Sequence, residues 1–449
     1  MNDERLRRLA RSAFILHRSS FVKTIPKLRR VNAAVTVPPS KSYSVRALLL
    51  AAMTEGDTTI VNCLDADDTR YALEALRTVG FRIGGSFMSG LTIGERVSMS
   101  AEEVPVFVGN AGTAMRFLAG WLAFTPGRFL LHGEKRMHER PIGDLVEVLQ
   151  RIGAEVEYVE REGYPPLRIR GKKMRGGFDV EISASTSSQF ASSLMMAGAT
   201  LPGGIALRIV SLASEPYIEI TADILRSFGA KVERRGAIVH VAGSKLRCDR
   251  YEVEGDYSSA SYWFAAAAAT GGTMRVTGLK RESAQGDARF LSILETMGCR
   301  IFWEGAGVIV NGPERLSGGR FDCNATPDLV PTLAAIAPAA SGPVEIVNVA
   351  NLRVKESDRL ATVSSELRRL GAHVEERDDS LRIEPGWSDT PAAIDTHDDH
   401  RIAMAFGVAG LVRGNVTIEN EQVVSKSYPG FWRTFDHVVA QGQGLPAPH

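Results

Sequence analysis

Several features that mark particular protein classes are scarce in this chain. Its 449 residues include four cysteines, Cys63, Cys248, Cys299 and Cys323, and none forms a CxxC pair. This spacing predicts neither a zinc site nor a disulfide framework, so we expect a reduced, cytoplasmic protein. The formal net charge is only +1, because 53 lysines and arginines face 52 aspartates and glutamates. Nucleic-acid binding is not expected, since it requires a basic patch or a high pI.

Long apolar runs are missing as well. The longest candidates, YWFAAAAAT and IAMAFGVAGLV, are too short to cross a bilayer and are typical of buried helices, so no membrane association is expected. Residues 1–22 are rich in arginine but lack the continuous apolar segment of a secretory signal. We interpret them as an N-terminal extension. A transit peptide is the alternative, against which Asp3 and Glu4 argue.

Nucleotide-binding and hydrolase motifs are also absent. The chain has no GxGxxG after a strand, no GxxxxGK followed by Ser or Thr, and no GxSxG. These absences argue against dinucleotide-binding, P-loop and nucleophile-elbow proteins. The run His397-Asp398-Asp399-His400 looks like a metal-binding segment, because residues i and i+3 of a helix share a face. No second pair of ligands stands out in the sequence, so we expect no metal site.

What the chain does contain is an internal repeat of roughly 70 residues. A helical run, a glycine and an alternating segment recur as ALEALRTVGFRI, LVEVLQRIGAEVEY, ADILRSFGAKVER, FLSILETMGCRIFW and SSELRRLGAHVEE, with the glycines at Gly80, Gly153, Gly229, Gly298 and Gly371. Glycine takes the left-handed conformation that ends many helices without strain. The period-two alternation that follows predicts a half-buried strand.

A second pattern interleaves with the first. A polar turn opens an almost wholly apolar helix six times, in SKSYSVRALLLAAMTEGDTTIV, GNAGTAMRFLAGWLAFTPGRFLL, SSQFASSLMMAGATLPGGIALRI, SSASYWFAAAAATGGTMRV, PDLVPTLAAIAPAASGPVEIV and DHRIAMAFGVAGLVRGNVTI. Helices that are apolar all round are buried. Each unit therefore combines a surface helix with a buried helix, and the chain length fits two domains. We predict an α/β protein in which three units close around their buried helices in each domain.

The polar residues gather where the buried helices begin, at 40–42, 109–113, 187–189, 255–261, 326–328 and 398–401. Helix N-termini carry free N–H groups and partial positive charge, so they are natural seats for phosphate and carboxylate. Each opening could instead be a plain N-cap. Nearby cations favour anion binding, namely Lys41, Arg46, Arg116 and Arg401.

Further cations occur in loops of unusual composition. GEKRMHERPIG holds Arg136 and Arg140, NLRVKESDRL holds Lys355 and Arg359 beside Glu356, and VVSKSYPGFW holds Lys426. The second of these segments could alternatively be a solvated helix face with i,i+4 ion pairs.

At these residues the chain resembles the EPSP synthases, or 3-phosphoshikimate 1-carboxyvinyltransferases, of the enolpyruvyl transferase family. The similar segments include SKSYSVRALLLAA, LDADDTRYALEALRTVG, GNAGTAMR, RMHERPIGDLV, SSQFASSLMMAGA, SEPYIEIT, EGDYSSASYWFAAAA, NLRVKESDRLATVSSELRRLGAHVE and THDDHRIAMAF, in family order from about residue 30 to residue 435. The resemblance implies a two-domain inverse α/β barrel, each domain with three βαβαββ units. It implies a first domain of 23–38 plus 256–449, a second of 39–255, and an active site in the cleft between them.

The resemblance also implies transfer of the enolpyruvyl group of phosphoenolpyruvate to the 5-hydroxyl of shikimate 3-phosphate, in aromatic amino acid biosynthesis. Shikimate 3-phosphate would contact Lys41, Ser42, Arg46, Ser187, Ser188, Gln189, Ser214, Tyr217, Asp328, Asn351 and Lys355. Phosphoenolpyruvate would contact Lys41, Asn110, Gly112, Arg140, Gln189, Arg359, Arg401 and Lys426. Arginine suits both carboxylates and phosphates because it can contact them in bidentate fashion.

The implied reaction is an addition followed by an elimination. We assign Asp328 as the candidate base for the hydroxyl and Glu356 as the candidate acid and base at C3, with Lys41 assisting. This scheme requires neither a metal nor an organic cofactor, and we expect a monomer. Three residues depart from the family pattern: Phe117 in place of proline, Val45 in place of asparagine and Glu215 in place of lysine. Phe117 could tilt the second buried helix and alter how the pocket near Gly112 accepts inhibitors such as glyphosate.

Two alternatives stay open at this point. The UDP-N-acetylglucosamine enolpyruvyl transferases share the implied fold, but they use a loop cysteine, and GEKRMHERPIG has none. A catalytically silent, anion-binding homologue is the second alternative, against which the presence of both Asp328 and Glu356 argues.

Overall fold

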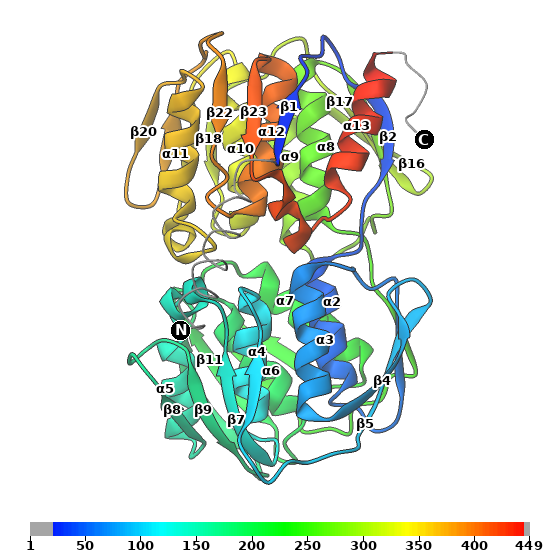
Figure 1. The fold of residues 1–449 in the computed structure, drawn as a ribbon, viewed down its shortest axis with the longest axis vertical. Coiled ribbons are helices and arrows are strands. Elements are labelled where there is room, and N and C mark those ends of the chain that lie inside the picture. The colour runs from blue at the N-terminus through cyan, green and yellow to red at the C-terminus, as the bar shows by residue number, and fades with distance from the viewer. Residues whose placement is uncertain (1–20, 444–449) are drawn as a thin grey trace, which may run out of the picture.

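The structure, a computed structural model, describes residues 21–443 and has two lobes, one above the other in Figure 1. The lower lobe holds α2 (Lys41–Ala51), β3 (Thr58–Val61), α3 (Asp67–Val79), β4 (Phe81–Ser86), β5 (Gly90–Arg96), β6 (Val104–Phe107), α4 (Gly112–Leu122), β7 (Gly127–His132), the 3-10 helix η1 (Lys135–Glu139), α5 (Gly143–Arg151), β8 (Glu155–Tyr158), β9 (Leu167–Gly171), β10 (Phe178–Ser183), α6 (Gln189–Ala199), β11 (Ile205–Val210), α7 (Pro216–Ser227), β12 (Val232–Arg235), β13 (Ile238–Val241) and β14 (Arg250–Glu252).

The upper lobe contains both the first strands of the described chain and all of its last part. It holds β1 (Val22–Ile25), β2 (Asn32–Thr36), α8 (Tyr257–Thr270), β15 (Thr273–Thr277), η2 (Gly286–Arg289), α9 (Phe290–Thr296), β16 (Arg300–Glu304), β17 (Gly307–Asn311), β18 (Gly319–Asp322), η3 (Pro327–Leu329), α10 (Val330–Ile336), η4 (Ala337–Ala339), β19 (Val344–Val347), η5 (Ala350–Val354), α11 (Arg359–Arg369), β20 (Val374–Glu376), β21 (Leu381–Ile383), β22 (Ala392–Ile394), α12 (His400–Arg413), β23 (Val416–Glu419), η6 (Glu421–Lys426) and α13 (Phe431–Gly442).

Each repeat forms one small mixed sheet. The strand orders in the lower lobe are β14-β3-β5-β4, β6-β7-β9-β8 and β10-β11-β13-β12, and in the upper lobe they are β2-β15-β17-β16, β18-β19-β21-β20 and β1-β23-β22. In β6 and β7, for example, a parallel pair is connected by the buried helix α4, and an antiparallel hairpin completes the sheet. The predicted α/β class with six units is therefore confirmed, although the sixth sheet has three strands because β1 replaces the hairpin.

The helix ends follow the repeat. All five predicted glycines have positive φ, at 106°, 90°, 84°, 101° and 81° for Gly80, Gly153, Gly229, Gly298 and Gly371. At Gly80 a Cβ atom would lie 2.3 Å from the carbonyl oxygen of Ser98, so close packing also excludes a larger residue. The helix-end prediction is confirmed, because only glycine adopts this conformation routinely next to such a neighbour.

Each lobe has its own hydrophobic core. One core is formed by buried side chains between Tyr43 and Val253, and the other by side chains in 25–37 and between Tyr257 and Val438. The apolar helices α2, α4 and α6 lie in the first core, and α8, α10 and α12 lie in the second. These are the six helices predicted to be buried.

Within residues 21–443 the chain passes between the lobes twice, through two short segments that lie side by side. The amide of Ser40 donates to the carbonyl of Glu254 at 2.7 Å, and the amide of Asp256 donates to the carbonyl of Pro38 at 2.9 Å. A Cβ at Gly255 would lie 2.2 Å from the carbonyl oxygen of Gly278, so this position requires glycine. Both crossings are main-chain structures of a few residues.

The N-terminal boundary needs one correction. Val22, which the sequence assigned to the extension 1–22, already pairs with Glu419 in the sheet of the upper lobe. Residues 1–20, on which the extension and transit-peptide interpretations rest, lie outside the described residues. Within residues 21–443, no helix combines the length and the apolarity needed to cross a membrane.

Candidate active site

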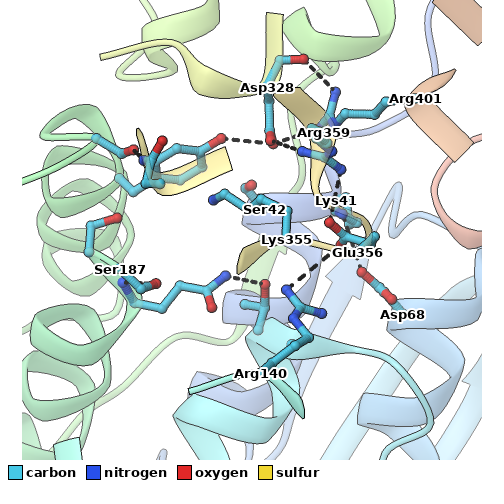
Figure 2. Close-up of a pocket in the computed structure, with 17 residues that line it drawn as sticks. Lys41, Ser42, Asp68, Arg140, Ser187, Asp328, Lys355, Glu356, Arg359 and Arg401 are labelled. Atoms are coloured by element: carbon cyan, nitrogen blue, oxygen red, sulfur yellow. Dashed lines mark hydrogen bonds and ion pairs between the residues drawn. The ribbon is translucent and has the colours of Figure 1, made fainter. Parts of the chain in front are cut away.

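A cavity lies between the lobes, and every residue that lines it except Gly112 is polar. Figure 2 shows side chains from both lobes pointing into it. It is lined by Lys41, Ser42, Asp68, Gly112, Thr113, Arg140, Ser187, Ser188, Gln189, Ser214, Tyr217, Asp328, Asn351, Lys355, Glu356, Arg359 and Arg401. Five of these side chains are cations and three are carboxylates. Most ligand pockets are mainly apolar, so this wall favours a small polar anion.

The openings of the buried helices converge on the cavity, as the repeat pattern predicts. Lys41 and Ser42 begin α2, Gly112 and Thr113 begin α4, and Gln189 begins α6. Among residues 21–443, the N-cap residues of these three helices make no side-chain cap hydrogen bond. Of the first amides, that of Lys41 donates to Oδ2 of Asp256 at 3.1 Å and that of Gln189 donates to Oγ of Ser187 at 3.3 Å. By contrast, Asp256 caps α8 by accepting from the amide of Ser259. The other first-turn N–H groups of α2, α4 and α6 lie at the cavity, where a helix N-terminus favours an anion.

Asp328 lies between two arginines at the top of the cavity. Its Oδ1 accepts from Nη1 of Arg359 at 2.9 Å, and its Oδ2 accepts from Nη2 of Arg401 at 2.6 Å. Burial alone would raise the pKa of this carboxyl group, but Arg401 and Arg359 outweigh it and hold the pKa well below its usual range. The group is ionised at neutral pH.

Glu356 is held in a similar way. Nη2 of Arg359 donates to its Oε2 at 2.9 Å, and Nη2 of Arg140 lies 3.9 Å from its Oε1. The pKa of Glu356 is well below the ordinary value, because Arg359 and Arg140 overcome the opposing effect of burial. Arg359 is itself buried and is anchored from behind by Asp399, whose Oδ2 accepts from its Nε at 2.7 Å. One arginine therefore orients both candidate proton-transfer residues.

The third acid of the cavity, Asp68, received no assignment from the sequence. It lies at the start of α3, 3.2 Å from Nζ of Lys41 and 2.8 Å from Nζ of Lys426. These two lysines, from different lobes, lower its pKa against the opposing effect of burial. The sequence pattern of α3 does indicate that Asp68 is special. Asp68, Ala72, Leu76 and Val79 share the buried face of this helix, where an acid needs a charged or hydrogen-bonding partner.

Lys355 lines the cavity, and its pKa is shifted. Burial lowers its pKa to about 8, although Asp328 acts in the opposite direction. Thr113, which the sequence also left unassigned, accepts a hydrogen bond from Nε2 of the Gln189 side chain at 2.9 Å. Asn351 donates to the hydroxyl of Ser214 at 3.0 Å, so these two residues contact each other across the lobes.

Three residues expected to contact substrate do not line the cavity. Arg46 is buried beneath it, where Nε donates to Thr221 at 2.9 Å and the guanidinium lies 4.9 Å from the Phe117 ring. Burial lowers its pKa to about 10. The carbonyl oxygen of Asn110 accepts from Lys426 at 2.7 Å and from Arg140 at 3.3 Å. Asn110 and Lys426 thus stand directly behind the lining residues, whereas Arg46 braces α2 against α7.

The segment His397-Asp398-Asp399-His400 has other partners than a metal. Asp399 holds Arg359, and Nε2 of His397 lies 3.1 Å from Oε1 of Glu366. Among residues 21–443, no three His, Cys, Asp or Glu side chains are grouped so that they could hold a metal ion.

Comparison with known proteins places this site in a family. The family model for EPSP synthase (3-phosphoshikimate 1-carboxyvinyltransferase) matches residues 25–435. The chain belongs to the EPSP synthase family. The family resemblance seen in the sequence is thus confirmed.

Named relatives agree with this assignment. The 3-phosphoshikimate 1-carboxyvinyltransferase of Vibrio vulnificus is 44% identical over 416 residues, which cover 91% of this chain and 97% of that protein. The protein of the same name from Paraburkholderia phytofirmans is 44% identical over 421 residues, with coverages of 90% and 96%. A solved EPSP synthase structure from Acinetobacter baumannii superimposes with a TM-score of 0.78 at 26% identity, covering 94% of this chain and 98% of that one. The inverse α/β barrel of this family is therefore the fold of the chain.

Proposed function

We propose that the protein transfers the enolpyruvyl group of phosphoenolpyruvate to the 5-hydroxyl of shikimate 3-phosphate and releases phosphate, as a step of aromatic amino acid biosynthesis. The observation that carries the proposal is the cavity between the lobes, where five cations and three carboxylates meet the N-termini of α2, α4 and α6. Two substrates with a phosphate and a carboxylate each match this excess of positive charge.

The shikimate 3-phosphate half of the site lies mainly in the lower lobe. Its hydroxyl groups come from Ser42, Ser187, Ser188, Ser214 and Tyr217, with Gln189 beside them, and Asn351 and Lys355 reach it from the upper lobe. Serine hydroxyls next to the N-termini of α2 and α6 are good donors to a phosphate. Arg46 supports this half indirectly, because its Nη1 donates to the carbonyl of Ser42 at 3.0 Å.

The phosphoenolpyruvate half is formed by Arg140, Arg359 and Arg401, with Lys41 and Gln189 at its edge. Gly112 leaves room here, since a Cβ atom would lie 2.6 Å from Nη2 of Arg140 and from Nη1 of Arg116. Asn110 and Lys426 hold this half from behind through the contacts described above. Three arginines around one small ligand can accept its carboxylate and its phosphate separately.

The proposed reaction has two steps. The 5-hydroxyl oxygen forms a bond to C2 of phosphoenolpyruvate and gives its proton to Asp328, while the electron pair of the C2–C3 double bond takes a proton at C3 from Glu356. The C2–O bond to phosphate then breaks, Glu356 takes a proton back from C3, and the double bond forms again. The phosphate is released as hydrogen phosphate with the proton that Asp328 had accepted, which regenerates the base. Lys41, 3.2 Å from Asp68, assists by neutralising charge on the departing phosphate.

Glu356 must carry a proton in the first step, although its pKa is depressed in this structure. The cause of the depression is the field of Arg359 and Arg140, which are also the cations offered to phosphoenolpyruvate. An anion bound to these arginines offsets their field, so the pKa of Glu356 rises when the substrate is present. The substrate itself thus prepares the acid that protonates it.

We also propose that the protein acts as a monomer in the cytoplasm. Its four cysteines are free and three of them are buried, which suits a reducing compartment. Phosphate release from phosphoenolpyruvate plus shikimate 3-phosphate tests the function directly. The same assay with UDP-N-acetylglucosamine as acceptor is expected to give no phosphate, and release with that acceptor alone would overturn the proposal. No release with either acceptor would favour a silent anion-binding homologue.

A further inference from the structure

The short helix η1 carries an arginine that spans the two lobes without lining the cavity. Nε of Arg136 donates to the carbonyl oxygen of Glu356 at 3.0 Å, and its Nη2 donates to the carbonyl oxygen of Lys355, also at 3.0 Å. The third nitrogen, Nη1, donates to Oε2 of Glu139 on the same helix at 2.9 Å. All three nitrogens of the guanidinium are therefore used, two of them on the opposite lobe.

The acceptors are two successive main-chain carbonyls in the loop between η5 and α11. A planar guanidinium can hold two neighbouring acceptors at once and thereby fix the direction in which the chain runs. The loop residues in question are Lys355 and Glu356, whose side chains both line the cavity. Fixing their carbonyls therefore also fixes where these side chains start.

The same segment of the lower lobe also reaches the Glu356 side chain. Arg140, four residues after Arg136, lies 3.9 Å from the Glu356 carboxylate. From within the upper lobe, Arg359 holds the other carboxylate oxygen. The main chain of Glu356 is thus held by one arginine of the lower lobe, and its carboxylate is held between one arginine from each lobe.

We propose that Arg136 is a positioning residue that couples the approach of the two lobes to the placement of Glu356 and Lys355. The proposal rests on the proposed function of Glu356 in proton transfer. Arg136 does not touch the reacting atoms; it sets the position of the group that does. A displacement of about 1 Å in a reacting group can slow a reaction by about 100-fold. Loss of the two hydrogen bonds from Arg136 is therefore expected to lower kcat.

The fold is expected to tolerate loss of this side chain. Arg136 is 35% exposed, so water can reach the two carbonyls after the guanidinium is removed. We therefore compare Arg136→Gln with Arg136→Lys, which keeps the charge but has only one nitrogen for the two carbonyls. The matched control is Arg168→Gln, which removes an arginine from β9 of the same lobe, where it pairs with Glu103 at 2.7 Å.

The first measurement is steady-state kinetics together with calorimetric binding of shikimate 3-phosphate. For Arg136→Gln we expect kcat to fall about 10- to 100-fold, with a shifted pH profile of kcat and with shikimate 3-phosphate affinity and Tm close to the parent. Arg136→Lys should recover little of the loss, and Arg168→Gln should match the parent. A lysine variant with parent-like kcat would show that charge alone matters and would overturn the proposal, as would an unchanged kcat in Arg136→Gln.

The second measurement does not depend on catalysis. Hydrogen exchange of the backbone amides in 355–358 is expected to be faster in Arg136→Gln than in the parent and in Arg168→Gln. If the parent releases no phosphate, the proposed function fails, yet the exchange result still decides whether Arg136 holds the loop. Equal exchange in all three proteins would overturn the positioning role, whatever the activity.

Discussion

The hydroxyl of Tyr217 in the lower lobe donates a hydrogen bond to Oδ2 of Asp328 in the upper lobe at 3.0 Å. Burial, followed by the negative charge of Asp328, raises the pKa of Tyr217, so its hydroxyl keeps the proton that it donates. Arg401 donates to the same carboxylate oxygen at 2.6 Å. A residue of the proposed shikimate 3-phosphate site and the candidate base are therefore in direct contact across the cavity.

Shikimate 3-phosphate alone is expected to bind the protein and to raise its Tm. Most of its proposed contacts, such as Ser42 and Ser187, belong to the lower lobe and do not need the second substrate. A dissociation constant of 1 mM corresponds to a binding free energy of only about 4 kcal/mol, so calorimetry at millimolar ligand detects even weak binding. Absence of any binding heat or thermal shift at that concentration would remove the substrate assignment.

Asp328→Asn and Glu356→Gln are expected to fold normally and to lose most turnover. A positioned acid or base contributes roughly 100- to 10,000-fold to the rate, and both replacements keep shape while removing the charge. Circular dichroism and Tm check the fold, and phosphate release gives kcat. If both variants retain activity within a factor of about three of the parent, the proton-transfer roles are wrong.

The parts of this architecture that are local could be predicted from the sequence. A glycine after an amphipathic run and an apolar helix after a polar turn are determined by residues close in the chain, so the helix ends and the openings were found. Contacts between the lobes depend on geometry that no local pattern contains. The pattern of α3 indicates that Asp68 is buried but not that Lys426 of the other lobe is its partner, and nothing in the sequence distinguishes Arg136 from the other loop cations.

The direction of the Arg46 side chain is a second feature that no local pattern contains. A cation one turn inside a helix that opens on an anion site looks like a ligand, yet its side chain turns away to Thr221 and the Phe117 ring. The helix α2 is buried on nearly all sides, so a long side chain at this position packs against α7 rather than entering the cavity. Position along a helix can be predicted from sequence, but the direction of a long side chain in a crowded core depends on its neighbours.

Binding of shikimate 3-phosphate at pH 8.5 is expected to take up a proton through Lys355. Burial lowers the pKa of this lysine to about 8, so it is largely neutral at that pH without ligand. A bound phosphate stabilises the charged form and raises the pKa, so the complex carries more protons than the free protein, and affinity falls as the pH rises above 8. Calorimetry in two buffers with different ionisation enthalpies measures the uptake. Lys355→Met should abolish it, and an uptake that persists in this variant would assign the proton to another group.

Gly112→Ala is expected to raise the KM for phosphoenolpyruvate roughly 10-fold or more, with little effect on shikimate 3-phosphate binding. The new methyl group would lie 2.6 Å from Nη2 of Arg140, which must move away from the ligand. Gly84→Ala is the control, because no atom lies within 4 Å of a Cβ at that position. Equal KM values in the parent and in Gly112→Ala would show that Arg140 is not a phosphoenolpyruvate contact.

The lobes are expected to draw closer when both substrates bind. Within residues 21–443 the main chain connects them through two short crossings, near Pro39 and Gly255, which can act as a hinge, and side chains such as Tyr217 and Asp328 also meet between them. Carboxylates already balance part of the positive charge between the lobes: Asp68 pairs with Lys41 and Lys426, and Asp328 pairs with Arg359 and Arg401.

The cavity still has two more cations than carboxylates, so two anionic substrates remove the remaining repulsion and favour contact. Closure also excludes water, which strengthens every charge contact around the intermediate. Small-angle scattering with shikimate 3-phosphate and an unreactive phosphoenolpyruvate mimic should show a smaller radius of gyration than the free protein. Scattering with shikimate 3-phosphate alone is the control that separates one substrate from two. An unchanged radius of gyration under saturating ligand would contradict closure and would mean that the site is assembled before the substrates bind. The proposed roles of Asp328 and Glu356 would not be affected, because they rest on the contacts of those two residues.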